Sequence, residues 1–301
     1  MDSGGSCLGV CYTGNQLFYS VNNTGQNSHL TRIGSIDFNF DIEQAIISGH
    51  SDGFPTLKSS LEEIKQEFEC SAVKILAPAT EECWTIVPRS VYEDASEREA
   101  HIQLLMRGSD RSEIQAIWQT VSNSDNRLLL LRDNSSMEGI NNLLYNFSDK
   151  EIVSDYELGI DWQLHTGDTG AFLMIHCQKN YISVTSFILG KLRGCTYIDY
   201  DELSDLTYLW NLYAEKLSWM RGMHENTYVF GHYGKSVIDL LNAFWHDHGS
   251  IRIPDTLEAM KVDAPEKTYG FRLESAFPAI MMSLNKEMAD NTLHENYNRQ
   301  T

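Results

Sequence analysis

The sequence predicts an α/β protein with two lobes of similar design and a small α+β insert in the first lobe. A three-stranded β-meander followed by a helix and a further strand is expected twice, once from near residue 8 and again from near residue 171. The two halves share no visible sequence identity, so the duplication rests on the order of the elements. With 301 residues and 42% hydrophobic content, the chain can bury one large core or two smaller ones.

The first copy begins with a β-hairpin. Its predicted elements are strands at 8–12, 16–21 and 29–40, a helix at 57–68 and a strand at 72–77. The first two strands are β-prone runs separated by Thr13, Gly14 and Asn15, which form a hairpin-turn signal. The third alternates apolar and polar residues, and the helix has apolar residues at helical spacing. The last strand is a continuous apolar run that ends at Pro78.

The insert is expected at about residues 82–148. Its predicted elements are strands at 84–87, 113–121 and 127–132 and helices at 96–106 and 137–147. These short strands and few helices suffice for a compact α+β unit, but not for a separate nucleotide-binding fold. A strand at 152–155 and a helical segment at 156–164 then lead into the second copy.

The second copy repeats the opening order. Its predicted elements are strands at 171–177, 181–189 and 191–200, a helix at 202–220, a strand at 227–230, a helix at 236–245, a β-run at 250–253 and a final helix at 273–289. Tight turns join the three opening strands, as in the first copy. We therefore expect one lobe at 1–155 and the other at 156–301.

Charge argues against several classes of partner. Lys and Arg number 23 against 42 Asp and Glu, which gives a formal net charge of -19. A surface this acidic repels DNA, RNA and anionic lipid, because these are bound chiefly through Lys and Arg. The sequence has no apolar stretch of the roughly 18 residues that a membrane helix needs and no export signal at its start. We expect a cytoplasmic protein that neither binds nucleic acid nor inserts into a membrane.

Apolar and turn residues form a consistent pattern in five short segments, 155–158, 170–175, 183–187, 190–192 and 279–284. Together with the duplicated order of elements, this pattern resembles the actin-like ATPase fold. More narrowly, it resembles the bacterial branch that holds the type IV pilus protein PilM and the cell-division protein FtsA, or an uncharacterised bacterial family of the same fold. The resemblance spans Leu8 to Leu284 and implies two ribonuclease H-like lobes. Each lobe would hold a mixed five-stranded sheet with helices, and the final helix would pack back toward the first lobe.

The resemblance also implies where ATP and Mg²⁺ would bind. Active members carry an Asp-x-Gly-like turn in each opening hairpin, with a carboxylate for the hydrated Mg²⁺ and a glycine that lets backbone N–H groups approach phosphate. Here the first turn contains Thr13, Gly14 and Asn15, a hydroxyl and a glycine without an acid. The second turn, residues 176–180, has neither acid nor glycine, and Lys179 is its one cation.

A third turn, rich in glycine, would contact adenosine in this fold. In this sequence it contains Gly231, Gly234, Lys235 and Ser236. Free N–H groups at the start of the following helix favour an anion, whereas the simpler interpretation is a strand-to-helix turn with Ser236 as the N-cap. The residues of the three turns form the candidate nucleotide cleft. We assign no catalytic and no metal-ligating residue, because the acids of both hairpin turns are missing.

Two classes of function follow. The first is a non-catalytic or weakly nucleotide-binding actin-like protein that acts as a cytoplasmic binding or assembly scaffold, with a protein partner or self-association and no cofactor. The alternative is an active ATPase or small-molecule kinase that uses ATP and Mg²⁺, with Asp155 or Asp161 supplying the metal or base function. The aromatic-rich helix near 208–219, or the strand edge of the insert, is the candidate docking surface, because aromatic residues are enriched at interface centres.

Overall fold

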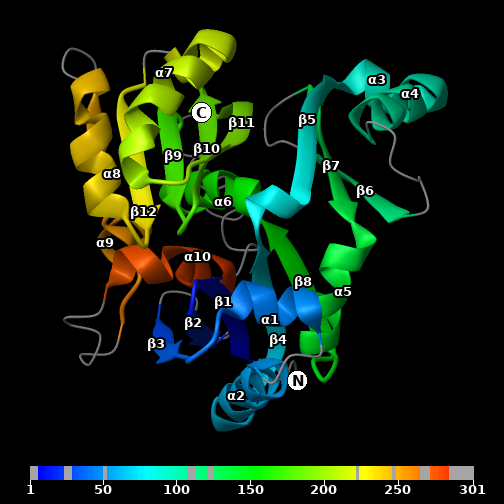
Figure 1. Ribbon diagram of the computed structural model, residues 1–301, viewed down its shortest axis with the longest axis vertical. Helices are drawn as coiled ribbons and strands as arrows, with labels where there is room; N and C mark the ends of the chain where they lie inside the picture. Colours follow the sequence, from blue (N-terminus) through cyan, green and yellow to red (C-terminus); the bar gives the residue numbers. More distant parts are fainter. Residues whose placement is uncertain are drawn as a thin grey trace, which may run out of the picture.

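Two five-stranded mixed sheets with the same strand order form the framework of the molecule (Figure 1). The computed structural model describes residues 6–23, 29–49, 53–106, 113–120, 125–221, 224–245, 249–264 and 272–284. The first sheet contains β1 (Ser6–Thr13), β2 (Gln16–Asn23), β3 (Leu30–Asp37), β4 (Cys70–Ala77) and β8 (Asp149–Ser154), in the order β3-β2-β1-β4-β8. The second contains β9 (Phe172–Cys177), β10 (Tyr181–Ile188), β11 (Lys191–Asp199), β12 (Asn226–Gly231) and β13 (Ser250–Arg252), in the order β11-β10-β9-β12-β13.

The two sheets also share their pairing pattern. In each lobe the three opening strands pair antiparallel, and the two later strands add in parallel on the side of the first strand. The predicted duplicated α/β fold is therefore confirmed. In each lobe the turn of the opening hairpin directly follows the first strand. The two turns approach one another between the lobes.

Helices α1 (Ile42–Ser48), α2 (Gly53–Glu67) and α5 (Asn134–Leu143) cover the outer face of the first sheet. Their buried side chains pack on apolar residues of β1 and β4. The sequence interpretation missed α1, although Asp41 accepts a hydrogen bond from the Gln44 backbone N–H and so acts as its N-cap. The short helix therefore fills the connection between β3 and α2.

The outer face of the second sheet is covered by α7 (Leu206–Lys216) and α8 (Gly234–Leu241). The long helix predicted at 202–220 is three pieces: a 3₁₀ turn, η4 (Leu203–Asp205), then α7, then a second 3₁₀ turn, η5 (Ser218–Arg221). The break after α7 occurs because Leu217 leaves helical geometry. A further short helix, α9 (Thr256–Met260), was also missed. None of the helices in the described part of the chain is long and apolar enough to cross a membrane.

Helix α10 (Leu273–Ser283) lies between the two lobes (Figure 1). It packs on β1 and β2 of the first sheet and on β12 of the second, next to α6 (Leu158–Thr166). At Gly9 of β1 the helix lies so close that a Cβ atom would be 2.0 Å from the carbonyl oxygen of Ala279. The last residues of the predicted closing helix, 285–289, lie outside the described residues.

The insert contains an antiparallel sheet in the order β5-β7-β6, made of β5 (Glu82–Pro88), β6 (Ile114–Thr120) and β7 (Asn126–Asp133). Helices α3 (Arg89–Glu93) and α4 (Ala95–Met106) pack against it. Helix α5 falls within the insert range expected from the sequence, 82–148, yet Met137, Ile140 and Leu143 are buried in the core of the first lobe. We therefore propose that the insert comprises residues 82–133 and that α5 belongs to the lobe.

Candidate functional site

The two opening hairpin turns face each other across the space between the lobes. A Cβ atom on Gly14 would lie 4.0 Å from Cδ of Lys179, so the first and second turns are in van der Waals reach. Two cavities of about 480 Å³ each adjoin this contact. Thr13, Gly14, Asp41 and Lys179 line both cavities, so together the cavities form one interlobe cleft.

Some of the predicted site residues line the cleft and others do not. Thr13, Gly14, Asn15 and Lys179 of the two hairpin turns line the cleft. Gly231 is needed for its backbone, because its φ is +98° and a Cβ would lie 2.3 Å from the Cys177 carbonyl oxygen.

The rest of the third turn contributes to the cleft through residues that the sequence interpretation did not single out. His232 and Tyr233 line the second cavity, whereas Gly234, Lys235 and Ser236 form the first turn of α8 and are not among the residues lining either cavity. Because α8 begins at Gly234, Ser236 lies inside the helix and is not its N-cap. Burial, together with the nearby Arg272, lowers the pKa of His232.

Carboxylates enter the cleft from α1. Asp41 and Glu43 both line the first cavity, opposite Lys179. Burial raises the pKa of Glu43, and the neighbouring charges of Asp41 and Glu81 raise it further. The sequence interpretation overlooked these acids, although Asp41 followed by Gln44 is a helix N-cap pattern that indicates a helix start here.

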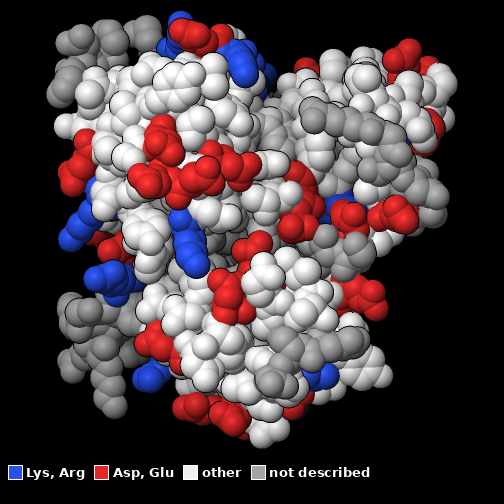
Figure 2. Space-filling model, in the orientation of Figure 1, with Lys and Arg blue, Asp and Glu red and all other residues white. Residues whose placement is uncertain are grey.

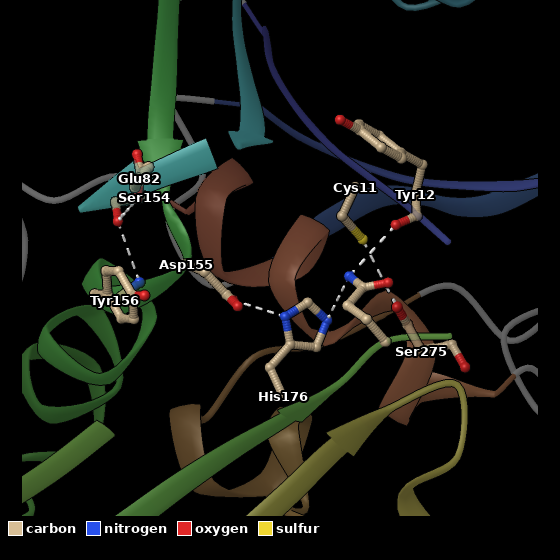
Figure 3. A network of polar contacts seen from close by, with 9 residues as sticks. Cys11, Tyr12, Glu82, Ser154, Asp155, Tyr156, His176 and Ser275 are labelled. Carbon is tan, nitrogen blue, oxygen red and sulfur yellow. Dashed lines mark hydrogen bonds and ion pairs between the residues drawn. The ribbon is translucent and has the colours of Figure 1, made fainter. Parts of the chain in front are cut away.

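A buried polar chain runs from Asp155 through His176 to Gln178, which lines the first cavity together with Tyr12 (Figure 3). His176 Nδ1 lies 2.6 Å from Asp155 Oδ1, and both side chains are almost fully buried. The Gln178 Nε2 group lies 3.2 Å from His176 Nε2 and donates to the Tyr12 carbonyl oxygen at 3.5 Å. With a proton on Nδ1 facing the carboxylate, Nε2 of a neutral ring accepts from the Gln178 amide. The chain thereby joins β9 of the second lobe to β1 of the first.

His176 is held on its other sides as well. The Phe230 ring stacks on the imidazole with a centroid distance of 5.0 Å. Asp155 directly follows β8, at the start of a capped 3₁₀ turn, so its backbone is also fixed. Asp161 lies buried in α6, and neither Asp155 nor Asp161 is among the residues lining the two cavities. Asp155 therefore takes part in the buried polar chain, and Asp161 lies buried in α6 outside both cavities.

Comparison with known proteins is informative at the level of structure. No protein-family model and no curated protein matches the sequence. A chain of the PilM–PilN type IV pilus biogenesis complex matches with a TM-score of 0.67 and 13% identity, over 92% of this chain and 96% of that one. A Bacteroides thetaiotaomicron protein with an actin-like ATPase fold and unknown function matches with a TM-score of 0.53 and 12% identity, over 87% and 99%.

The chain has the actin-like ATPase fold. This agrees with the resemblance read from the sequence, which implies that ATP and Mg²⁺ would bind in the interlobe cleft. At 13% identity and below, the similarity concerns the fold alone, so the chemistry of the cleft depends on its own residues.

Several polar groups of the two hairpin turns already have partners within the protein. In the first turn, the Gly14 carbonyl accepts from Ile42 N at 2.8 Å, and the Asn15 side chain donates to the Phe38 carbonyl at 2.8 Å. In the second turn, Tyr200 binds the carbonyl oxygens of Gln178 and Asn180, through its hydroxyl and its backbone N–H respectively. These polar groups stabilise the turns themselves. No cluster of three or more His, Cys, Asp or Glu suited to a metal ion occurs among the described residues.

Proposed function

We propose that this protein is an actin-like scaffold of the cytoplasm, which binds protein partners and does not depend on ATP hydrolysis. The observation that carries the proposal is the engagement of His176 by Asp155. In the second hairpin turn, where active members of the fold hold a metal-binding acid, this chain has a buried histidine whose two ring nitrogens both have protein partners. The resemblance to a chain of the PilM–PilN complex supports a role in protein assembly.

Electrostatics also support a weak or absent nucleotide interaction. A triphosphate needs local cations, a metal or free N–H groups to offset its charge. In the first cavity, Lys179 is opposed by Asp41 and Glu43, with Glu81 close to Glu43. An anion in the cleft would therefore meet more carboxylates than ammonium groups among the described residues.

Steady-state phosphate release tests this proposal. We expect purified protein with Mg²⁺ and ATP to release phosphate at the rate of the buffer alone, and Lys179→Ala to leave that rate unchanged. Lys216→Ala, which removes an exposed lysine of α7 outside both cavities, is the matched control. Release that exceeds the buffer rate and falls selectively in Lys179→Ala would overturn the proposal.

One observation favours the alternative of an ATPase or small-molecule kinase. Asp41 lines the second cavity together with His232 and Tyr233, so a carboxylate does lie beside the third turn. The same assay separates the two functions. An active enzyme that uses this acid would lose turnover in Asp41→Asn, whereas a scaffold has no turnover to lose.

A further inference from the structure

A larger groove separates the insert from the second lobe. Its volume is about 750 Å³, and it lies apart from the interlobe cleft, with no lining residue in common among those described. The insert contributes residues of β5 and the ends of α4, β6 and β7, and the second lobe contributes β11 and the end of α7. The aromatic helix and the insert edge that the sequence marked as candidate docking surfaces therefore form the two walls of one groove.

The walls carry large apolar side chains. Trp84 and Leu131 come from the insert, and Tyr213, Leu217 and Trp219 come from the second lobe. The ring of Trp84 packs on the buried Tyr156, with a centroid distance of 5.3 Å. Both walls therefore offer apolar and aromatic surface, and large aromatic side chains contribute much of the binding energy at protein interfaces.

The groove also has acidic residues in its lining. Glu81, Asp133 and Asp199 line it together with Glu82, whose carboxylate is buried and paired with Arg132, and no Lys or Arg does so among the residues that the structure describes. Figure 2 shows Asp and Glu side chains prominent on this face, over the second lobe and beside the insert.

Both walls end in an edge strand. β5 is the outer strand of the insert sheet, and β11 is the outer strand of the second sheet. Residues 82–84 of β5 and 195–197 of β11 line the groove. An extended segment from another chain can lie along the edge strand of a sheet.

We propose that this groove binds an extended segment of a protein partner in which basic and apolar residues alternate. In an extended segment, successive side chains point to opposite sides. Apolar side chains on one side would contact Trp84, Tyr213 and Trp219, while Lys or Arg on the other would meet the carboxylates. The proposal rests on the scaffold function and names the chemistry of the partner.

Fluorescence anisotropy with synthetic peptides tests the groove. The probe is a short labelled peptide of alternating Lys and Leu. Its controls are peptides of the same length that alternate Lys with Ser and Glu with Leu. We expect the Lys–Leu peptide to bind at least about tenfold more tightly than either control, with an affinity that falls as salt rises.

Two variants locate the binding. Asp199→Lys reverses an exposed charge of the groove, and Tyr213→Ser removes an aromatic ring. Each variant is expected to bind the Lys–Leu peptide about tenfold more weakly than the wild-type protein does. Asp239→Lys, an exposed position on α8 outside the groove, makes the same charge change and should leave the affinity within about twofold. Circular dichroism confirms that each variant is folded.

Three results would overturn the proposal. They are failure of the Lys–Leu peptide to bind, binding of the Lys–Ser peptide with equal affinity, or equal weakening by Asp199→Lys and Asp239→Lys. The last result would mean that the affinity for the peptide depends only on the net charge of the protein. Any of these results, together with the absence of phosphate release, would leave the scaffold function standing with its partner bound elsewhere. Nucleotide turnover that requires Lys179 would instead remove the scaffold function itself.

Discussion

Replacing Gly9 with alanine is expected to lower the free energy of unfolding by about 3 kcal/mol. A Cβ atom at this position would lie 2.0 Å from the Ala279 carbonyl oxygen and 2.9 Å from the Ser283 backbone nitrogen. Both are backbone atoms of α10, so the clash can be relieved only by moving the helix or β1. Urea unfolding followed by circular dichroism measures the loss.

The effect should reach the second lobe, because α10 also contacts that sheet. Phe277 lies 4.3 Å from Phe230 and 5.6 Å from Trp162, measured between ring centroids. Gly234→Ala is the matched control, since a Cβ there meets nothing closer than 3.7 Å and its backbone is helical. An equal loss of stability in both variants would contradict the close packing of α10 on β1.

Replacing Arg132 with methionine is expected to cost about 3–5 kcal/mol of stability at neutral pH. Arg132 Nε lies 2.5 Å from Glu82 Oε1, the carboxylate is buried, and Arg132 also donates to the Ile152 carbonyl at 3.1 Å. Ser154 donates a further hydrogen bond to Glu82 (Figure 3). Without Arg132, the Glu82 carboxylate would stay buried beside the junction of the insert and the first lobe but would lose its cationic partner.

The cost should depend on pH. Burial raises the pKa of Glu82 to about 7, even though Arg132 and Ser154 act in the opposite direction. A carboxyl with a raised pKa binds its proton more tightly in the folded state, so its contribution to stability is present at low pH and is lost as pH rises through about 7. Arg132→Met should therefore cost less at about pH 5 than at about pH 8.

Adding Glu82→Gln to Arg132→Met provides the control, because it removes the buried charge. The double variant should recover part of the lost stability at about pH 8 and show little of the pH dependence. A cost for Arg132→Met that is the same at both pH values, with no recovery in the double variant, would mean that the charge of Glu82 is not what destabilises the protein.

The β-strands of both lobes could be predicted from sequence, because alternation, apolar runs and turn residues are local signals. The hairpin turns at Gly14 and Lys179 were found for the same reason, and the fold then brings them together. Helix α1 was missed because seven residues give too little periodicity to detect. Its N-cap pattern was the available signal, and with it the acids of the cleft would have been found.

The remaining features depend on contacts between distant segments. Asp155 and His176 are 21 residues apart on different elements, and no local pattern links them. The groove likewise requires β5 and β11 to lie close together, which follows from how the insert is attached to the first lobe. Helix α5 was assigned to the insert because sequence order alone does not indicate which core a helix enters.

The central claim is that the interlobe cleft does not serve Mg²⁺-ATP, and thermal unfolding in the presence of nucleotide tests it most directly. A ligand that binds only the folded state raises the unfolding midpoint by mass action. We predict that millimolar ATP or ADP with Mg²⁺ leaves the midpoint of the wild-type protein and of Lys179→Ala unchanged. A rise in the wild-type midpoint that is lost in Lys179→Ala would contradict the claim.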